Sequence, residues 1–159
     1  MAPLSPLPVP VLVFPSSAEL GPVLAQLVTS RAGKAIGSHG RFTLGLSGGS
    51  LVSMLSKELL ALSELDCSKW LVGFCDERLV SFDDPESTYG LYKSQLFSKI
   101  NIPESGILTI DCSLPVNECA EDYTRKLKEV HSNHRLLDFS VCRIFTSLFS
   151  LLKHTGLPR

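Results

Sequence analysis

Short apolar runs alternate with amphipathic segments along most of the chain. Four runs have the length and apolar character of β-strands: residues 11–14, 42–46, 70–75 and 107–110. The segments that follow them repeat apolar residues at the three- and four-residue spacing of α-helices. Strands that alternate with helices predict a parallel sheet with right-handed crossover connections. We therefore expect an α/β fold, in which a Rossmann-like, mostly parallel sheet is flanked by helices.

Two helix starts are marked by capping residues and prolines. Ser16 and Glu19 have the spacing of a capping box. Pro22, however, favours a first helix that begins a little later than Ser16, with the proline near its first turn. Asp84 followed by Pro85 has the pattern of an N-cap and a first helical residue, so we expect a later helix to begin there.

The chain divides into three parts by composition. Residues 1–10 contain four prolines and are expected to form a flexible lead-in. Residues 11–139 carry the alternating pattern, and we expect them to form one α/β domain, with the start of a further strand at 136–139. Residues 140–159 contain no acidic side chain, and their apolar positions are compatible with one amphipathic helix. We therefore interpret residues 140–159 as a divergent tail.

Composition narrows the possible partners and compartments. The 15 Lys and Arg residues nearly balance the 16 Asp and Glu residues, which gives no reason to expect nucleic acid or a membrane as partner. The apolar run at 141–152 is interrupted by Arg143 and is far shorter than the ~20 residues that span a bilayer. No two cysteines have C-x-x-C spacing, so we expect reduced thiols in a cytoplasmic protein. The four histidines have no recognisable metal or triad context.

The segment Ser47, Gly48, Gly49 and Ser50 lies between a predicted strand and a predicted helix. Its glycines permit positive φ angles and a close approach of the backbone to a ligand. The N–H groups at the start of the helix, together with the helix dipole, suit a phosphate, and the serines add hydroxyl donors. The same residues also fit a tight turn with no ligand. Taken alone, they favour neither interpretation.

A second polar cluster, Asp76, Glu77 and Arg78, follows the apolar run at 70–75. The carboxyl ends of parallel strands meet at one edge of a sheet, so this cluster can face the same crevice as residues 47–50. Arg78 could hold a phosphate through two hydrogen bonds, while the carboxylates could accept hydrogen bonds from sugar hydroxyls or orient Arg78. A solvated ion pair is the alternative. The presence of two clusters at one edge favours a binding site.

Further hydroxyl groups come from Ser87 and Thr88, near the start of the next helix. They could complete a pocket for a polyol. An aromatic residue at the spacing of Tyr89 is more often part of the core, with its hydroxyl at the edge.

Three segments together make the pattern specific. They are LGLSGGSL at residues 44–51, GFCDER at residues 73–78 and ESTYGLY at residues 86–92. In order and spacing these segments resemble the 6-phosphogluconolactonases, and the resemblance covers roughly residues 11–139. The wider family also includes glucosamine-6-phosphate deaminases, and Arg78 favours the lactonase branch.

The resemblance implies a cytosolic, metal-free hydrolase of the pentose phosphate pathway that needs no cofactor. Its partner would be a phosphorylated sugar lactone, 6-phosphogluconolactone, which it would open to 6-phosphogluconate. By motif position, the substrate and its phosphate would contact Ser47, Gly48, Gly49, Ser50 and Arg78. The supporting residues would be Asp76, Glu77, Ser87 and Thr88.

One segment departs from the family pattern. The resemblance places a glycine-rich segment with Asp-Gly-His, whose histidine is the catalytic base, just after residues 137–139. This chain reads SVCR at residues 140–143 and contains no Asp-Gly-His. The catalytic residue is therefore unassigned, and the fold is expected to be incomplete relative to the family. The open alternatives are a lactonase with a replacement base, a non-catalytic isoform or sugar-phosphate-binding fragment, and a glucosamine-6-phosphate deaminase.

Overall fold

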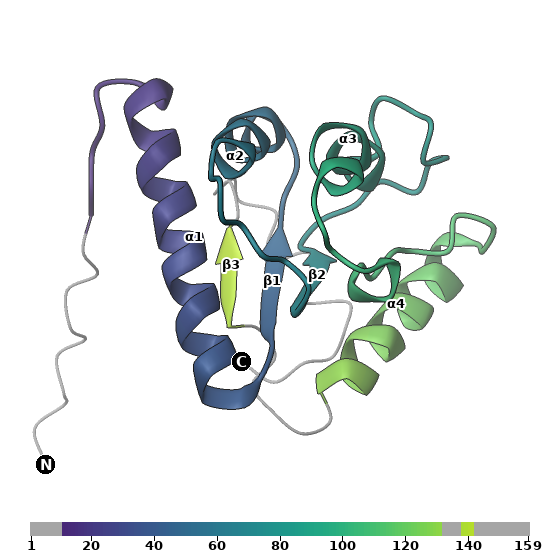
Figure 1. Ribbon diagram of the computed structural model, residues 1–159. Coiled ribbons are helices and arrows are strands. Elements are labelled where there is room, and N and C mark those ends of the chain that lie inside the picture. Colours follow the sequence, from purple (N-terminus) through teal and green to yellow (C-terminus); the bar gives the residue numbers. More distant parts are fainter. Residues whose placement is uncertain (1–10, 132–137, 142–159) are drawn as a thin grey trace, which may run out of the picture.

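A parallel three-stranded sheet forms the centre of the described chain. The computed structural model describes residues 11–131 and 138–141. The strands are β1 (Phe42–Leu46), β2 (Trp70–Phe74) and β3 (Phe139–Val141). The strand order is β2-β1-β3, and both outer strands run parallel to β1, with Phe42 paired to Trp70. The predicted α/β class with a Rossmann-like parallel sheet is confirmed (Figure 1).

Four α-helices surround the sheet in the described part of the chain. They are α1 (Ser17–His39), α2 (Ser50–Leu60), α3 (Thr88–Gln95) and α4 (Val116–His131). Two short 3₁₀ helices, η1 (Phe97–Lys99) and η2 (Glu104–Gly106), lie between α3 and α4 along the chain. In Figure 1 the strands point toward the part of the molecule that holds α2 and α3. The carboxyl ends of the strands are therefore close to these two helices.

The central strand is buried along its whole length. Every residue of β1 is buried, and Phe42 and Leu46 are at most 1% exposed. Hydrophobic side chains from α1, α2, β2 and α3 pack in the same cluster as β1. Such burial is expected where helices cover both faces of a parallel sheet. Because β1 is held in this core, the position of residues 47–50, which follow it directly, is set by the packing of the strand.

α1 begins directly after Ser16, earlier than the sequence pattern favours. Ser16 is the N-cap, and its side chain accepts a hydrogen bond from the Glu19 N–H at 3.3 Å. Pro22 lies inside the helix rather than near its start. The neighbouring Gly21 is buried, and a Cβ atom there would lie 2.9 Å from a side chain of α2. The cap and the close packing of α1 on α2 outweigh the one hydrogen bond that the proline removes.

Residues 11–14 do not form the predicted first strand. They have no strand pairing, and Val11, Leu12 and Val13 are 80%, 75% and 87% exposed. An apolar run becomes a strand only where a neighbour accepts and donates its backbone hydrogen bonds. One side of β1 is paired with β2 and the other with β3, so β1 offers no edge to residues 11–14.

The strand predicted at 107–110 is reduced to a single bridge between Ile107 and Val72. The next parallel ladder bond would run from the Phe74 N–H to the Leu108 carbonyl oxygen. The Tyr123 hydroxyl occupies that place: it accepts from the Phe74 N–H at 2.7 Å and lies 3.4 Å from the Leu108 carbonyl oxygen. A side chain from α4 therefore replaces the next backbone pairing.

The helix predicted at Asp84 and Pro85 begins only after Ser87. Asp84 forms turns instead, because its carboxylate accepts from the Glu86 N–H at 2.8 Å and its carbonyl oxygen accepts from the Ser87 N–H at 2.9 Å. Ser87 is the N-cap of α3, and its side chain accepts from the Gly90 N–H at 3.0 Å.

β3 confirms the further strand expected near residues 136–139. It begins at Phe139 and continues to Val141, across the boundary expected for the divergent tail. The expected lead-in at 1–10 and the rest of the tail, residues 142–159, lie outside the described residues.

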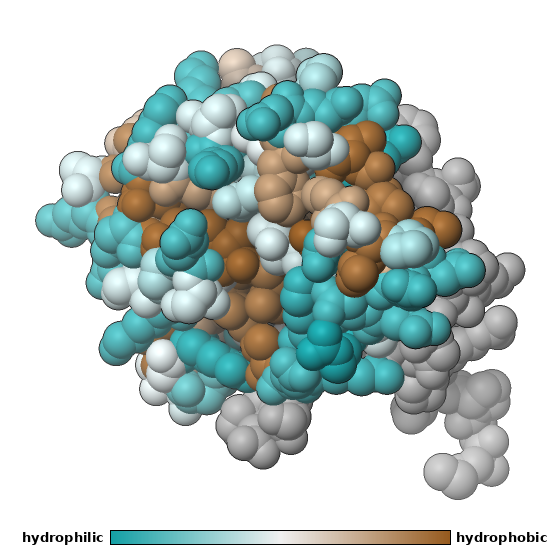
Figure 2. Space-filling view, turned by 90° about the vertical axis from the view of Figure 1, so that its right-hand side faces the viewer, coloured by the Kyte–Doolittle hydropathy of each residue, from teal (hydrophilic) through white to brown (hydrophobic). Residues whose placement is uncertain are grey.

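The exposed surface is mixed in character. Figure 2 shows the face that lies on the right of Figure 1, where hydrophobic groups lie between hydrophilic ones. Across the described ranges, no helix is both long and apolar enough to cross a membrane.

Candidate functional site

Residues 47–50, which we call the β1 loop, lead from β1 into α2. Gly49 is the N-cap of α2 and has φ 73° and ψ −150°, a conformation open to glycine and strained for other residues. Gly49 has no side chain with which to cap the helix, and the first turn of α2, all of it described, contains no acidic residue. The N-terminal N–H groups and the positive end of the helix dipole can therefore act on an external anion.

The segment after β2 starts beside the β1 loop. The Cys75 N–H donates to the Leu46 carbonyl oxygen at 2.8 Å, which extends the parallel pairing past the end of β2. Asp76 and Arg78 follow with exposed side chains. The structure thus brings the two polar clusters to the same edge of the sheet, as the sequence predicts.

Glu77 bonds to backbone rather than projecting into solvent. Its Oε1 accepts hydrogen bonds from the N–H groups of Arg78 and Thr88, and its Oε2 accepts from the N–H of Tyr89, each at 2.8 Å. In this conformation both carboxylate oxygens are used at the start of α3. Of the two roles expected for Glu77, accepting hydrogen bonds from a sugar or orienting Arg78, these contacts favour the second, because Oε1 binds the Arg78 N–H.

Ser87 and Thr88 are buried at the start of α3, and Thr88 lies against the β1 loop. Ser87 is 0% exposed and Thr88 is 6% exposed. A Cβ atom at Gly48 would lie 2.8 Å from Oγ1 of Thr88, so glycine is required for this contact. Tyr92 of α3 donates its hydroxyl to the Ser47 carbonyl oxygen at 3.1 Å. α3 therefore supports the β1 loop from the side.

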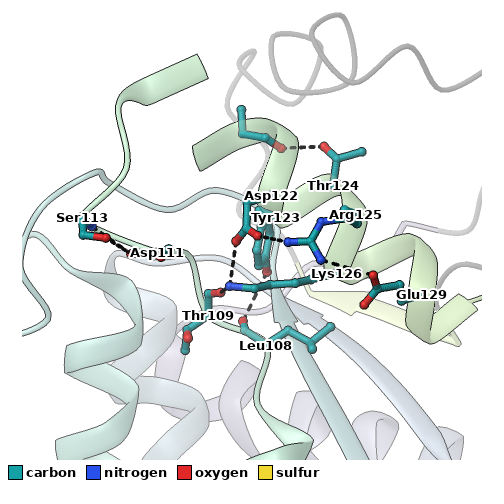
Figure 3. A network of polar contacts seen from close by, with 11 residues as sticks. Leu108, Thr109, Asp111, Ser113, Asp122, Tyr123, Thr124, Arg125, Lys126 and Glu129 are labelled. Carbon is teal, nitrogen blue, oxygen red and sulfur yellow. Dashed lines mark hydrogen bonds and ion pairs between the residues drawn. The ribbon is translucent and has the colours of Figure 1, made fainter. Parts of the chain in front are cut away.

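Tyr123 of α4 has a positioning role that the sequence pattern does not reveal. Its hydroxyl accepts a hydrogen bond from the N–H of Phe74, the last residue of β2, close to the polar cluster at 76–78. Figure 3 shows the same hydroxyl bonded to the Leu108 carbonyl oxygen. Gly73 makes room for it, because a Cβ atom there would lie 3.3 Å from the hydroxyl oxygen. Burial raises the pKa of the Tyr123 hydroxyl, which therefore stays protonated at neutral pH. An aromatic residue on the apolar face of a helix is the only sequence signal.

Charged residues on the exposed side of α4 pair with each other. Asp122 bonds to Arg125, and its other oxygen lies 2.8 Å from Nζ of Lys126 (Figure 3). Lys126 also donates to the Thr109 carbonyl oxygen at 3.2 Å, and Arg125 pairs with Glu129 at 3.3 Å. The bond from Lys126 holds α4 against the segment that carries Thr109, and the ion pairs lie within α4. None of these contacts uses a residue of the β1 loop.

Three hollows of the described chain lie away from the β1 loop and Arg78. Their linings contain none of these residues, and one hollow of about 800 Å³ lies beside Lys93 and Lys126. Over residues 11–131 and 138–141, no group of three or more His, Cys, Asp or Glu residues could hold a metal ion.

Known proteins with similar sequences and structures belong to one family. Residues 15–142 match the family model described as glucosamine-6-phosphate isomerases/6-phosphogluconolactonase. The 6-phosphogluconolactonase of Rattus norvegicus is 55% identical over 130 residues, which are 79% of this chain and 51% of that protein. The 6-phosphogluconolactonase of Homo sapiens is 54% identical over 130 residues, with 79% and 50% covered. The solved structure of 6-phosphogluconolactonase from Trypanosoma cruzi is 27% identical, has a TM-score of 0.64, and is matched over 78% of this chain and 51% of that chain.

The chain spans about half the length of the curated relatives that it matches. The matched range contains the β1 loop, the end of β2 and the start of α3. The resemblance inferred from the three sequence segments is therefore confirmed. The chain belongs to the family of glucosamine-6-phosphate isomerases and 6-phosphogluconolactonases.

Proposed function

We propose that this chain carries the phosphate-binding part of a 6-phosphogluconolactonase site and binds 6-phosphogluconolactone of the pentose phosphate pathway in the cytoplasm. The β1 loop is the observation that carries the proposal. The positive φ of Gly49 presents the start of α2 at the carboxyl edge of the sheet. A phosphate there would gain both from backbone N–H donors and from the helix dipole.

Arg78 supplies the complementary positive charge. Its side chain is exposed after β2, and the bond from the Cys75 N–H to the Leu46 carbonyl oxygen sets this segment beside the β1 loop. A guanidinium group can bind two phosphate oxygens through parallel hydrogen bonds. Arg78 and the start of α2 would then hold the same phosphate from two neighbouring strand ends.

The phosphate would serve as a handle for a reaction at the other end of the ligand. Binding energy from a group that does not react can orient the lactone carbonyl for attack by water. Hydrolysis also needs a general base for that water and donors for the developing oxyanion. The sequence contains no Asp-Gly-His segment, so we assign no residue of this chain as the base. Binding of the ligand therefore does not require hydrolysis, and each can be measured without the other.

Binding of 6-phosphogluconate, the stable reaction product, tests the proposal. Calorimetry of the full chain should detect binding, and Arg78→Ala should weaken the affinity roughly 10- to 100-fold. This range corresponds to the about 1.5–3 kcal/mol that a hydrogen bond to a charged group contributes.

Arg125→Ala is the matched control, because Arg125 is an exposed arginine on α4 that pairs with acidic residues of its own helix. It removes the same charge and should leave the affinity unchanged. Equal affinity of the wild-type chain and the Arg78→Ala variant would contradict the proposal, as would equally tight binding of gluconate, which has no phosphate.

A further inference from the structure

Glu77 connects the end of β2 to the start of α3 through its carboxylate. One donor is the N–H of the next residue, Arg78. The other two are the N–H groups of Thr88 and Tyr89, which follow Glu77 by eleven and twelve residues. All three distances are 2.8 Å, within the range of charge-assisted hydrogen bonds. A carboxylate at this place also interacts favourably with the positive end of the α3 dipole.

The contacts continue from α3 to the β1 loop. The side chain of Thr88 lies directly against Gly48, where no side chain would fit. One turn further along α3, the Tyr92 hydroxyl donates to the Ser47 carbonyl oxygen at 3.1 Å. A continuous series of contacts therefore runs from the backbone of Arg78 through Glu77 and α3 to the β1 loop.

We propose that Glu77 is a positioning residue for phosphate binding, which holds Arg78 and the β1 loop in a fixed relative position without contacting the phosphate. This inference rests on the proposed function. Like charges repel, so the carboxylate is unsuited as a direct ligand for a phosphate dianion. Its hydrogen bonds to three N–H groups instead fix the two segments that would bind that dianion.

Two roles of Glu77 predict opposite effects of Glu77→Gln. If Glu77 acted only as a nearby negative charge, its removal would relieve repulsion and tighten the binding of 6-phosphogluconate. If Glu77 positions the site, binding becomes weaker. The amide nitrogen of glutamine cannot accept a hydrogen bond, so at least one of the three N–H groups loses its partner.

The test compares 6-phosphogluconate affinities by calorimetry, expressed per folded protein from a urea denaturation curve. Glu77→Gln should bind roughly 10-fold more weakly than the wild-type chain. Glu104→Gln, which removes the same charge from an exposed position in η2, should stay within about twofold. Glu77→Asp keeps the charge on a shorter side chain and should also bind 6-phosphogluconate more weakly. If Glu77→Gln does not fold, the affinity of Glu77→Asp tests the proposal in its place. Wild-type or tighter affinity in the folded Glu77 variants overturns the proposal.

A failure of the proposed function gives a different result from a failure of this inference. If the wild-type chain does not bind 6-phosphogluconate, the proposed function fails. The positioning role is then decided by the amide NMR spectrum without ligand. Altered chemical shifts of Ser47 and Gly48 in Glu77→Gln, absent from Glu104→Gln, support it, and unaltered shifts at these residues overturn it.

Discussion

Two glycines with positive φ lie at opposite ends of the sheet. Gly49 in the β1 loop has φ 73° and ψ −150°, and Gly40, after the end of α1, has φ 84° and ψ −1°. They are the positive-φ residues of the described ranges. Only Gly49 belongs to the proposed phosphate site, so the pair separates the effect of backbone strain from the effect on binding.

Gly49→Ala should weaken 6-phosphogluconate binding, because a Cβ atom disfavours the backbone conformation that presents the start of α2. Gly40→Ala should lower the free energy of unfolding by about 1–2 kcal/mol and leave the affinity unchanged. Urea denaturation and calorimetry of both variants check these effects. Wild-type affinity in the Gly49→Ala variant would mean that this loop conformation is not needed for binding.

Short sequence patterns indicate which residues surround the candidate site, but not which residues form hydrogen bonds with them. Gly49 of the β1 loop is readable from sequence, because a strand-to-helix turn can require a positive φ angle. The need for glycine at position 48 is different, since it comes from the side chain of Thr88 in a distant helix. The partners of Glu77 lie up to twelve residues away, and Tyr123 lies 49 residues from Phe74, its partner in β2. No short spacing encodes such contacts, since folding alone brings these residues together.

At the scale of elements, a buried strand was predictable where its apolar run also had neighbours. Residues 42–46 and most of 70–75 form β1 and β2 as expected. Residues 11–14 are equally apolar but have no strand beside them, and composition does not reveal that difference. The sequence pattern predicts the start of α3 too early for a related reason. The carboxylate of Glu77, which lies eleven residues before Thr88, helps to cap the helix.

Asp138, which directly precedes β3, joins that strand to β1 and to the end of α1. Its Oδ2 accepts from the N–H and the hydroxyl of Thr43 in β1, each at 2.8 Å. Its Oδ1 lies 2.9 Å from Nε2 of His39 in the last turn of α1. Burial alone would raise the pKa of Asp138, but the hydrogen bonds from Thr43 and His39 outweigh it and hold the pKa below its usual value.

Asp138→Asn should reduce stability and change its dependence on pH. A carboxyl whose pKa is lowered by folding stabilises the fold above its unfolded pKa of ~4, and this contribution is lost as the pH falls through the folded pKa. The variant should therefore lose roughly 1–3 kcal/mol at pH 7 and show a flatter pH dependence below about pH 4. Denaturation curves across this range check it, with the exposed Asp83→Asn as control. An unchanged acid dependence in Asp138→Asn would contradict this account.

At the scale of the whole molecule, we expect phosphate binding and hydrolysis to depend on different segments of the chain. The β1 loop, Arg78 and α3 lie within the matched range, residues 15–142. The sequence has no Asp-Gly-His segment after residues 137–139, where the family resemblance places the catalytic base. We therefore expect the phosphate to bind and the hydrolytic step to be weak.

Hydrolysis of 6-phosphogluconolactone, corrected for spontaneous opening, should be ~10²–10⁴-fold slower than that of the rat 6-phosphogluconolactonase assayed beside it. A positioned general base contributes a factor of this size. A rate comparable with that of the rat protein would mean that another residue of this chain acts as the base, contrary to our expectation.

We propose above that the β1 loop and the start of α2 bind the phosphate of a sugar acid. An amide NMR titration of the full chain tests it most directly, with 6-phosphogluconate as ligand and gluconate as control. We predict saturable shifts of the amides of residues 48–51 with 6-phosphogluconate, no such shifts with gluconate, and their loss in Arg78→Ala. Shifts confined to other residues, or equal shifts with gluconate, would contradict the claim.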